Sequence, residues 1–180
     1  MTEAIRTHGY GQYMAWEQQQ LQSDWFRKLT DRAWPNHSVE ICDDPEMQKA
    51  GVDLLVHRPE HMVNEIPPWD RQARKVDCKF RRTNIEQDFL VEIRHIGPTV
   101  DMEGWGLRGL GVHYLMYVST QTQSARLMDW VQWWRWWLAN RNELSKSFPL
   151  SQAKNRTYVT YFVCLPWSLF DSQVDVRVIE

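Results

Sequence analysis

The spacing of apolar and polar residues divides the chain into helical and extended segments. Between residues 12 and 33, apolar side chains recur at intervals close to the helical period, and Pro35 follows. These side chains are Trp16, Leu21, Trp25, Phe26 and Leu29. We therefore expect one helix over residues 12–33 that ends before the proline.

Runs rich in β-branched and aromatic residues predict the strands. They cover residues 38–42, 52–57, 75–82, 89–96, 112–119, 157–165 and 174–179. A polar segment over 43–50 joins the first two strands, and a later helix is expected over 124–144. This order predicts one α/β domain over residues 1–180, with a central mixed β-sheet flanked by helices.

Two connections carry further expectations. Pro59, Pro67 and Pro68 mark a loop between the second and third strands, long enough to reach over a substrate groove. The segment over 97–111 is rich in glycine and is expected to be a mobile loop.

The third and fourth strands are separated by a short polar link over 83–87, which favours a hairpin. With its turn at Asn84 and Ile85, Glu92 falls opposite Asp77, and cross-strand partners share a face. Glu92 is then either an additional acid beside Asp77 or the partner of an arginine.

Tryptophans crowd the later helix and raise the question of base stacking. Core packing is favoured, because five side chains follow the period of a helix that buries one face. They are Trp130, Trp133, Trp134, Trp137 and Leu138. Trp136 lies off this stripe and is predicted to be exposed.

Composition limits the partners and the compartment. The net charge of −2 gives no global attraction to nucleic acid, so phosphate binding would depend on local basic clusters. The three cysteines are an odd number and lie far apart, which predicts reduced thiols in a cytoplasmic, intracellular protein. The cysteines and the six histidines show no zinc-type spacing, so a metal centre of His and Cys is not expected. No charged leader with an apolar run opens the chain and no apolar stretch approaches membrane-spanning length, so we expect neither secretion nor membrane insertion.

The candidate chemistry lies in two neighbouring strands. Asp53 follows Gly51-Val52 at the start of one apolar strand, and Asp77-Cys78-Lys79 lies in the next, after a gap of 23 residues. Side chains alternate along a strand, so Asp77 and Lys79 share a face while Cys78 points away. Charges entering an apolar core must be paired or bound to a metal, and two carboxylates with an ammonium would surround a divalent cation.

This pattern resembles the PD-(D/E)xK nuclease superfamily, in which an Asp on one strand precedes an acid-x-Lys on the next. The match covers about the first half of the chain, with Asp77 in place of the commoner Glu and no proline before Asp53. The resemblance implies a restriction-endonuclease-like core. Gly104-Trp105, an apolar strand and then Leu127 to Trp130 also look like small phage-encoded members, which would act in a bacterial host.

The resemblance also implies roles for the residues. Asp53 and Asp77 would bind Mg²⁺ or Mn²⁺ together with the main-chain carbonyl of Cys78, and Lys79 would orient or help deprotonate the attacking water. Family members often add an acid from the first helix, for which Glu17 is the candidate. A solvent-facing Glu17 is an equal alternative, and the acids Asp43, Asp44 and Glu46 compete for the same role.

Basic residues around the motif lysine are candidates for binding the phosphate backbone. The cluster contains Arg71, Arg74, Lys75, Lys79, Arg81 and Arg82, of which Arg74, Arg81 and Arg82 are the predicted nucleic-acid contacts. A second basic cluster over 135–156 is expected to be a solvated face.

These observations predict a metal-dependent nuclease that cleaves DNA, with an endonuclease or resolvase-like role. An RNase on the same fold is an alternative within this class, and a homodimer would suit cleavage of two strands. The alternative from another class is a non-catalytic nucleic-acid-binding or interaction module, in which Asp53, Asp77 and Lys79 form a structural ion-pair network.

Overall fold

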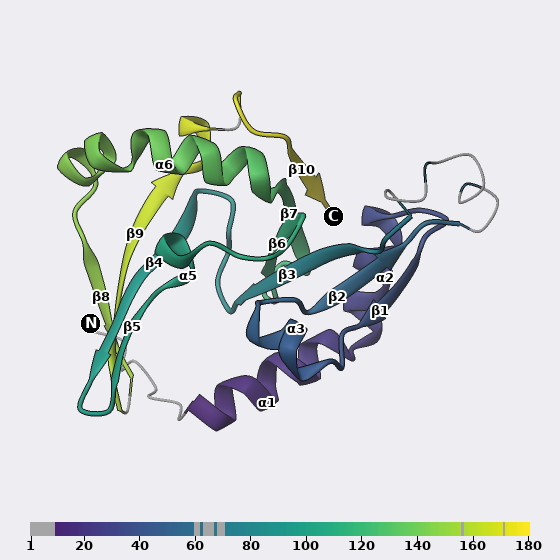
Figure 1. Cartoon of the computed structure of the whole chain (residues 1–180), viewed down its shortest axis with the longest axis horizontal. Helices are drawn as coiled ribbons and strands as arrows, with labels where there is room; N and C mark the ends of the chain where they lie inside the picture. The colour runs from purple at the N-terminus through teal and green to yellow at the C-terminus, as the bar shows by residue number, and fades with distance from the viewer. Residues whose placement is uncertain (1–9, 60–61, 63–66, 68–70, 156, 171) are drawn as a thin grey trace.

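The computed structural model of the chain describes residues 10–59, 62, 67, 71–155, 157–170 and 172–180. The described residues form an α/β structure with two β-sheets and a few helices (Figure 1). The loop predicted between the second and third strands lies for the most part outside the described residues.

The first sheet has the strand order β1-β2-β3-β6-β7-β10. Its strands are β1 (Ser38–Ile41), β2 (Leu54–His57), β3 (Arg74–Arg81), β6 (Tyr114–Ser119), β7 (Ser124–Asp129) and β10 (Val176–Ile179). The pair β3–β6 is parallel and the other neighbouring pairs are antiparallel, so the sheet is mixed, as the sequence predicts.

The second sheet is antiparallel, in the order β5-β4-β9-β8. Its strands are β4 (Asp88–Gly97), β5 (Val100–Glu103), β8 (Ser151–Lys154) and β9 (Val159–Pro166). Figure 1 shows it on the left of the first sheet, with α6 (Trp130–Ser147) running along the top of the molecule over both.

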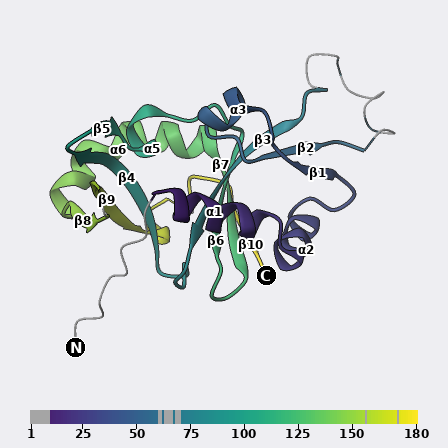
Figure 2. The same ribbon diagram turned by 90° about the horizontal axis from the view of Figure 1, so that it is seen from below.

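The remaining helices are short. They are α1 (Tyr10–Leu21), α2 (Asp24–Ala33), α3 (Pro45–Lys49), α5 (Trp105–Arg108) and the 3₁₀ turn η2 (Trp167–Leu169). Figure 2, seen from below, shows α1 crossing the six-stranded sheet beside α2.

Two apolar cores lie on opposite faces of the six-stranded sheet. One joins α1 and α2 to the face that carries Val76, Cys78 and Phe80. The other packs the opposite face against the four-stranded sheet, α5 and α6, and is centred on Phe89 and Trp133, both fully buried. Because β3 alternates between these cores, Asp77 and Lys79 face the second one.

The prediction of a single helix over 12–33 is wrong, because the chain forms two helices, α1 and α2, on either side of Ser23. The Ser23 hydroxyl donates to the carbonyl of Gln20 (2.7 Å) and accepts the amide of Phe26 (3.4 Å), so it ends α1 and caps α2. Serine competes for backbone groups in this way at helix ends.

The helix predicted from residue 124 starts too early. Residues 124–129 form β7, which pairs with β6 and β10, and α6 begins only at Trp130. The Asp129 carboxylate caps α6 by accepting the amide of Gln132 (2.8 Å).

The segments predicted as irregular contain regular structure. Residues 43–50 include α3, which Asp44 caps, and residues 97–111 contain β5 and α5 rather than a mobile loop. Gly106 allows α5 to pack on β4, because a Cβ there would lie 2.3 Å from Cγ1 of Val91. Strand β8 was not expected from the sequence.

The predicted hairpin of the third and fourth strands is wrong. Strand β3 lies inside the first sheet between β2 and β6, so both of its edges are occupied and β4 enters the second sheet. Glu92 therefore does not lie opposite Asp77 in a ladder.

The prediction of an exposed Trp136 is also wrong. Trp136 is 9 % exposed and its ring centroid lies 5.1 Å from that of Phe170, whereas Leu138 is 43 % exposed. The C-terminal segment covers the Trp136 side of α6, and helical spacing alone contains no information about that contact. Burial of Trp130, Trp133 and Trp137 is confirmed.

Candidate active site

Strand β3 presents Asp77 and Lys79 on the face that lies toward the second sheet. The Lys79 ammonium nitrogen lies 2.9 Å from Oδ1 of Asp77. The Asp77 side chain is 1 % exposed and that of Lys79 is 24 % exposed. The pair is therefore an ion pair whose acid is enclosed and whose base reaches solvent.

Asp53 lies opposite Asp77, one residue before β2 begins. Its amide donates to the carbonyl of Val76 (2.8 Å), and the register pairs Leu54 with Val76. Its carboxylate oxygen Oδ2 accepts the amide of Cys78 (2.7 Å). The backbone amide and carbonyl of one strand residue point to the same edge, so the Cys78 carbonyl lies on the edge of β3 where Asp53 is.

Burial and charge act together on the carboxyl group of Asp53. Burial raises its pKa well above the ordinary value, and the nearby Asp77 raises it further. The ammonium of Lys79 and the amide of Cys78 oppose this rise without cancelling it. When both carboxyl groups are ionised, two negative charges face one ammonium, and this excess of negative charge favours binding of a cation.

Lys79 remains protonated in this environment. Burial favours the neutral amine, but the charges of Asp77, Asp53 and Glu92 outweigh it and hold the pKa of Lys79 above its ordinary value. Cys78 behaves differently, because burial raises the pKa of its thiol, and the surrounding carboxylates raise it further. The Cys78 side chain is therefore a neutral thiol in the core between β3 and the helices α1 and α2.

One oxygen of the cluster has no hydrogen-bond partner among the described residues. This is Oδ2 of Asp77, which is buried. Gly51 lies nearby with φ +85°, and a Cβ on it would be 3.9 Å from that oxygen and 3.0 Å from Cδ2 of Leu110. A buried carboxylate oxygen without a donor is costly, and a proton shared with Asp53, a metal ion or a bound water would satisfy it.

Glu92 reaches this region from β4 in the second sheet. Its carboxylate lies 3.8 Å from Nη2 of Arg81 and 3.7 Å from Nε2 of His95. The alternative that Glu92 pairs with an arginine is thus confirmed, although its charge also acts on Lys79. His95 is held from its other side by Thr160, whose hydroxyl lies 3.0 Å from Nδ1.

Glu17 lies near the cluster on the other side of β3. Helix α1 packs on the face that carries Cys78 and Phe80, where the ring centroids of Trp16 and Phe80 are 6.3 Å apart. The charge of Glu17 contributes to raising the pKa of the Cys78 thiol. Its catalytic role stays a prediction, since Asp77 and Lys79 face away from α1.

The competing acids before β2 have local partners. Asp44 accepts the amides of Glu46 (2.8 Å) and Met47 (3.1 Å) as the cap of α3. Glu46 lies 2.6 Å from the ammonium of Lys49, and Asp43 is exposed.

The three arginines predicted to contact nucleic acid lie in different environments. Arg81 donates to the hydroxyl of Tyr117 (2.9 Å) beside Glu92. Arg82 lies over the ring of Trp16, with its guanidinium carbon 4.4 Å from the centroid. Arg74 lies at the far end of β3, opposite Val56.

Two contributors were not found by sequence reasoning. Tyr117 holds Arg81 and also accepts the amide of Leu90 (3.2 Å), but a tyrosine in an apolar strand is indistinguishable in sequence from a core residue. Gly51 lies two residues before Asp53, and a glycine directly before an apolar strand is the signal in the sequence that could have identified it; in the structure its φ is +85°.

The described residues contain no group of three or more His, Cys, Asp or Glu side chains that could hold a metal ion. They also contain no helix with the length and apolar character needed to cross a bilayer. In comparisons of the chain with protein-family models, curated proteins and solved structures, none matched.

Proposed function

We propose that this chain is a metal-dependent nuclease of the PD-(D/E)xK type, with a restriction-endonuclease-like core built from α1, β1, β2, β3 and β6. The observation that carries the proposal is the half-buried Asp53 and the buried Asp77 beside Lys79, with Oδ2 of Asp77 lacking a donor among the described residues.

The donor set fits a hard divalent cation. Mg²⁺ is usually held by one or two carboxylates and keeps several waters, so a third acidic side chain is not required. Asp53 and Asp77 would hold Mg²⁺ or Mn²⁺ with the carbonyl of Cys78. Burial and, after it, the charge of Asp77 raise the pKa of Asp53, and a cation beside the two acids would favour the charged form of Asp53. When bound, such an ion supplies charge neutralisation at a phosphate and a more acidic water.

Lys79 acts as a fixed cation in this proposal. Its raised pKa keeps the ammonium protonated at neutral pH, which favours orientation of the attacking water and stabilisation of negative charge over removal of a proton. Asp77 fixes the position of the ammonium through the 2.9 Å contact. Arg81, held by Tyr117, would bind a neighbouring phosphate.

The proposed substrate is DNA, cleaved by an endonuclease or resolvase-like activity, with RNA as the alternative polymer. Arg74, Arg81 and Arg82 are the proposed backbone contacts, and Glu17 is the proposed additional acid. A homodimer acting in the cytoplasm of a bacterial host, as a phage-encoded enzyme, would suit cleavage of two strands.

A non-catalytic module is the second candidate, and the short contact of Lys79 with Asp77 favours it. A buried ion pair can be purely structural, in which case Asp53, Asp77 and Lys79 would need no metal. The two functions differ in their response to Mg²⁺, which a structural network would not bind.

The test is incubation of the purified chain with supercoiled plasmid, linear duplex, branched DNA and single-stranded RNA, in Mg²⁺, Mn²⁺ or EDTA. We expect metal-dependent cleavage that Lys79→Ala lacks. Lys146→Ala is the matched control, because that lysine is exposed and pairs with the exposed Glu143 at 2.7 Å.

Intact substrates in every lane, together with a melting temperature that Mg²⁺ does not change, would favour the binding module. Cleavage that persists in Lys79→Ala would assign the activity to other residues or to a contaminant.

A further inference from the structure

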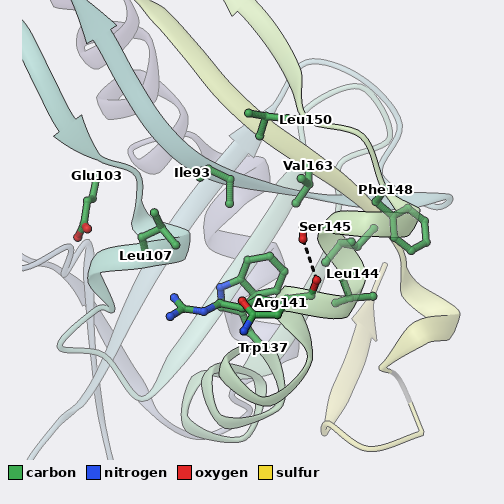
Figure 3. Close-up of a pocket in the computed structure, with 12 residues that line it drawn as sticks. Ile93, Glu103, Leu107, Trp137, Arg141, Leu144, Ser145, Phe148, Leu150 and Val163 are labelled. Atoms are coloured by element: carbon green, nitrogen blue, oxygen red, sulfur yellow. Dashed lines mark hydrogen bonds between the residues drawn. The ribbon is translucent and has the colours of Figure 1, made fainter.

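A pocket of about 640 Å³ lies between the C-terminal half of α6 and the four-stranded sheet (Figure 3). None of its lining residues belongs to the cluster of Asp53, Asp77 and Lys79. Its volume falls within the range of small-molecule sites in proteins, about 300–1,000 Å³. The nuclease proposal assigns no function to this pocket.

The walls of the pocket are mainly apolar. Val163 and Leu165 of β9 and Ile93 of β4 form the sheet side, while Leu144 and Phe148 form the opposite side. The indole of Trp137 also lines it and is fixed by donation of its N–H to the carbonyl of Gly106 (2.6 Å). The apolar surface is therefore formed by side chains of α6, β4 and β9, with the Trp137 indole held in place by a hydrogen bond.

Arg141 is the polar group that stands out at this pocket. Its side chain is half-buried, and Figure 3 shows it extending from α6 toward the side where Leu107 lies. Among the described residues its guanidinium has no hydrogen bond and no ion pair. A guanidinium that has no carboxylate partner in the protein and lies beside an apolar cavity can bind the carboxylate of a ligand.

The other polar residues of the lining are all exposed, and they are Glu103, Asn142 and Ser145. Glu103 lies opposite Arg94 in the β4–β5 ladder, and its charge helps to raise the pKa of that arginine. The hydroxyl of Ser145 donates to the carbonyl of Asn142 (2.8 Å). The half-buried charge of the lining is therefore the positive one of Arg141, whereas the carboxylate of Glu103 is exposed to water.

We propose that this pocket binds a small amphipathic anion of the medium-chain carboxylate class. The carboxylate lies on the guanidinium of Arg141, and the apolar chain lies between α6 and the β4–β9 face. The choice of occupant rests on charge complementarity: the cation is unmatched among the described residues, and the walls behind it are apolar. The inference is independent of the proposed nuclease activity.

Three ligands with the same twelve-carbon chain test the proposal. Dodecanoate, dodecanol and dodecylamine are titrated below their micellar concentrations into the full chain, and binding is followed by calorimetry. The indole N–H resonance of Trp137, assigned with Trp137→Phe, locates the site. We expect dodecanoate to bind with one-to-one stoichiometry, dodecanol more weakly and dodecylamine least.

Two variants separate the headgroup from the chain. Arg141→Gln should weaken dodecanoate binding about 10- to 100-fold, the range expected for a hydrogen bond to a charged group, and should change dodecanol binding less than about twofold. Ser145→Phe, which places a ring at the rim, should weaken both. Arg135→Gln, at an exposed arginine on the same helix outside the pocket, is the control and should change neither.

Absence of dodecanoate binding would overturn the proposal. Equal binding of dodecylamine, or unchanged binding in Arg141→Gln, would also overturn it, because the guanidinium would then have no part in recognition. A concentration-dependent dimer that Ser145→Phe dissociates, without dodecanoate binding, would instead assign the pocket to a second copy of the chain.

Discussion

Glu92 and His95 lie on the same face of β4, although residues three apart on a regular strand face opposite sides. The register with β9 pairs Glu92 with Phe162 and Arg94 with Tyr161, so Ile93 is an extra residue that forms a β-bulge. Beyond the bulge the alternation is reversed, which brings Nε2 of His95 to 3.7 Å from Glu92. Bulges are frequent next to active sites, where they redirect a side chain.

Glu92 lies beside Arg81 and its charge acts on Lys79, so the first prediction concerns Glu92→Gln. We expect the free energy of unfolding to change by less than about 1 kcal/mol, because the two ion pairs are long and partly exposed. Cleavage should fall less than about tenfold, since Asp77 and Asp53 still hold Lys79 protonated. Denaturant unfolding measures the change in stability, and kcat/KM measures the change in cleavage. A loss as large as that of Asp77→Asn would make Glu92 a metal ligand.

The second prediction concerns the charge of Asp53. Asp53→Asn removes the charge and keeps a side-chain oxygen for the Cys78 amide. Without metal, we expect the melting temperature at neutral pH to stay the same or rise, because burial and Asp77 disfavour the charged form. Stabilisation by Mg²⁺ should be lost. A parent that Mg²⁺ does not stabilise, together with a destabilised variant, would identify a structural network.

The same group predicts a dependence of stability on pH. Because the folded-state pKa of Asp53 is raised above the ordinary value of 3.8, the folded protein keeps this proton where the unfolded chain has lost it. The stabilising contribution is complete below 3.8 and is lost as pH rises through the folded-state pKa. The metal-free difference in free energy of unfolding between parent and Asp53→Asn should therefore favour the variant increasingly as pH rises. A difference independent of pH would contradict the raised pKa.

The third prediction concerns Lys79. Lys79→Met should destabilise the protein by about 3–5 kcal/mol, because Asp77 would be left buried without its cation. Lys79→Arg keeps the charge and should recover most of the stability but not the activity, since a guanidinium does not reproduce the position of the ammonium. Chemical unfolding and cleavage assays measure the two effects. Equal activity of Lys79→Arg and the parent would show that charge alone is required.

The core of the candidate site was predictable from the sequence because it depends on local rules. Alternation along residues 75–82 placed Asp77 and Lys79 on one face, and the structure adds that Asp53 lies opposite Asp77 by register. The surroundings of the site depend on contacts between distant segments. Tyr117 holding Arg81 and Glu92 arriving from a second sheet leave no periodic signal in the sequence.

The errors in the fold have the same origin. Residues 124–129 were assigned to a helix because the tryptophan pattern after them is helical, whereas pairing with β6 and β10 makes them a strand. The hairpin of β3 and β4 failed because the parallel strand β6 occupies the edge of β3 that β4 would have needed. Sequence separation favours a hairpin, but it does not reveal which partner fills an edge.

The fourth prediction compares Arg81, the last residue of β3, with Arg82, which follows it. Arg81 shares its face with Lys79, whereas Arg82 lies over Trp16 of α1. Arg81→Gln should therefore weaken DNA binding and lower the slope of log affinity against log salt by about one, and Arg82→Gln should do so less. Fluorescence anisotropy at several salt concentrations measures the slopes. A larger effect of Arg82→Gln would place the DNA on the α1 side.

The fifth prediction compares Gly51, which lies against Leu110, with Gly111, which follows Leu110 in the sequence. Gly51 has φ +85°, and a Cβ there would approach Cδ2 of Leu110 to 3.0 Å, while a Cβ on Gly111 would meet only the Cβ of Ala50 at 3.8 Å. Gly51→Ala should cost about 1–2 kcal/mol of stability from the left-handed backbone alone, and Gly111→Ala should cost less than about 0.5 kcal/mol. Because Gly51 adjoins Oδ2 of Asp77, its replacement should also weaken Mg²⁺ binding, measured by calorimetry. If Gly51→Ala left both stability and Mg²⁺ affinity at the level of Gly111→Ala, neither the backbone conformation nor the space beside Asp77 would matter to the site.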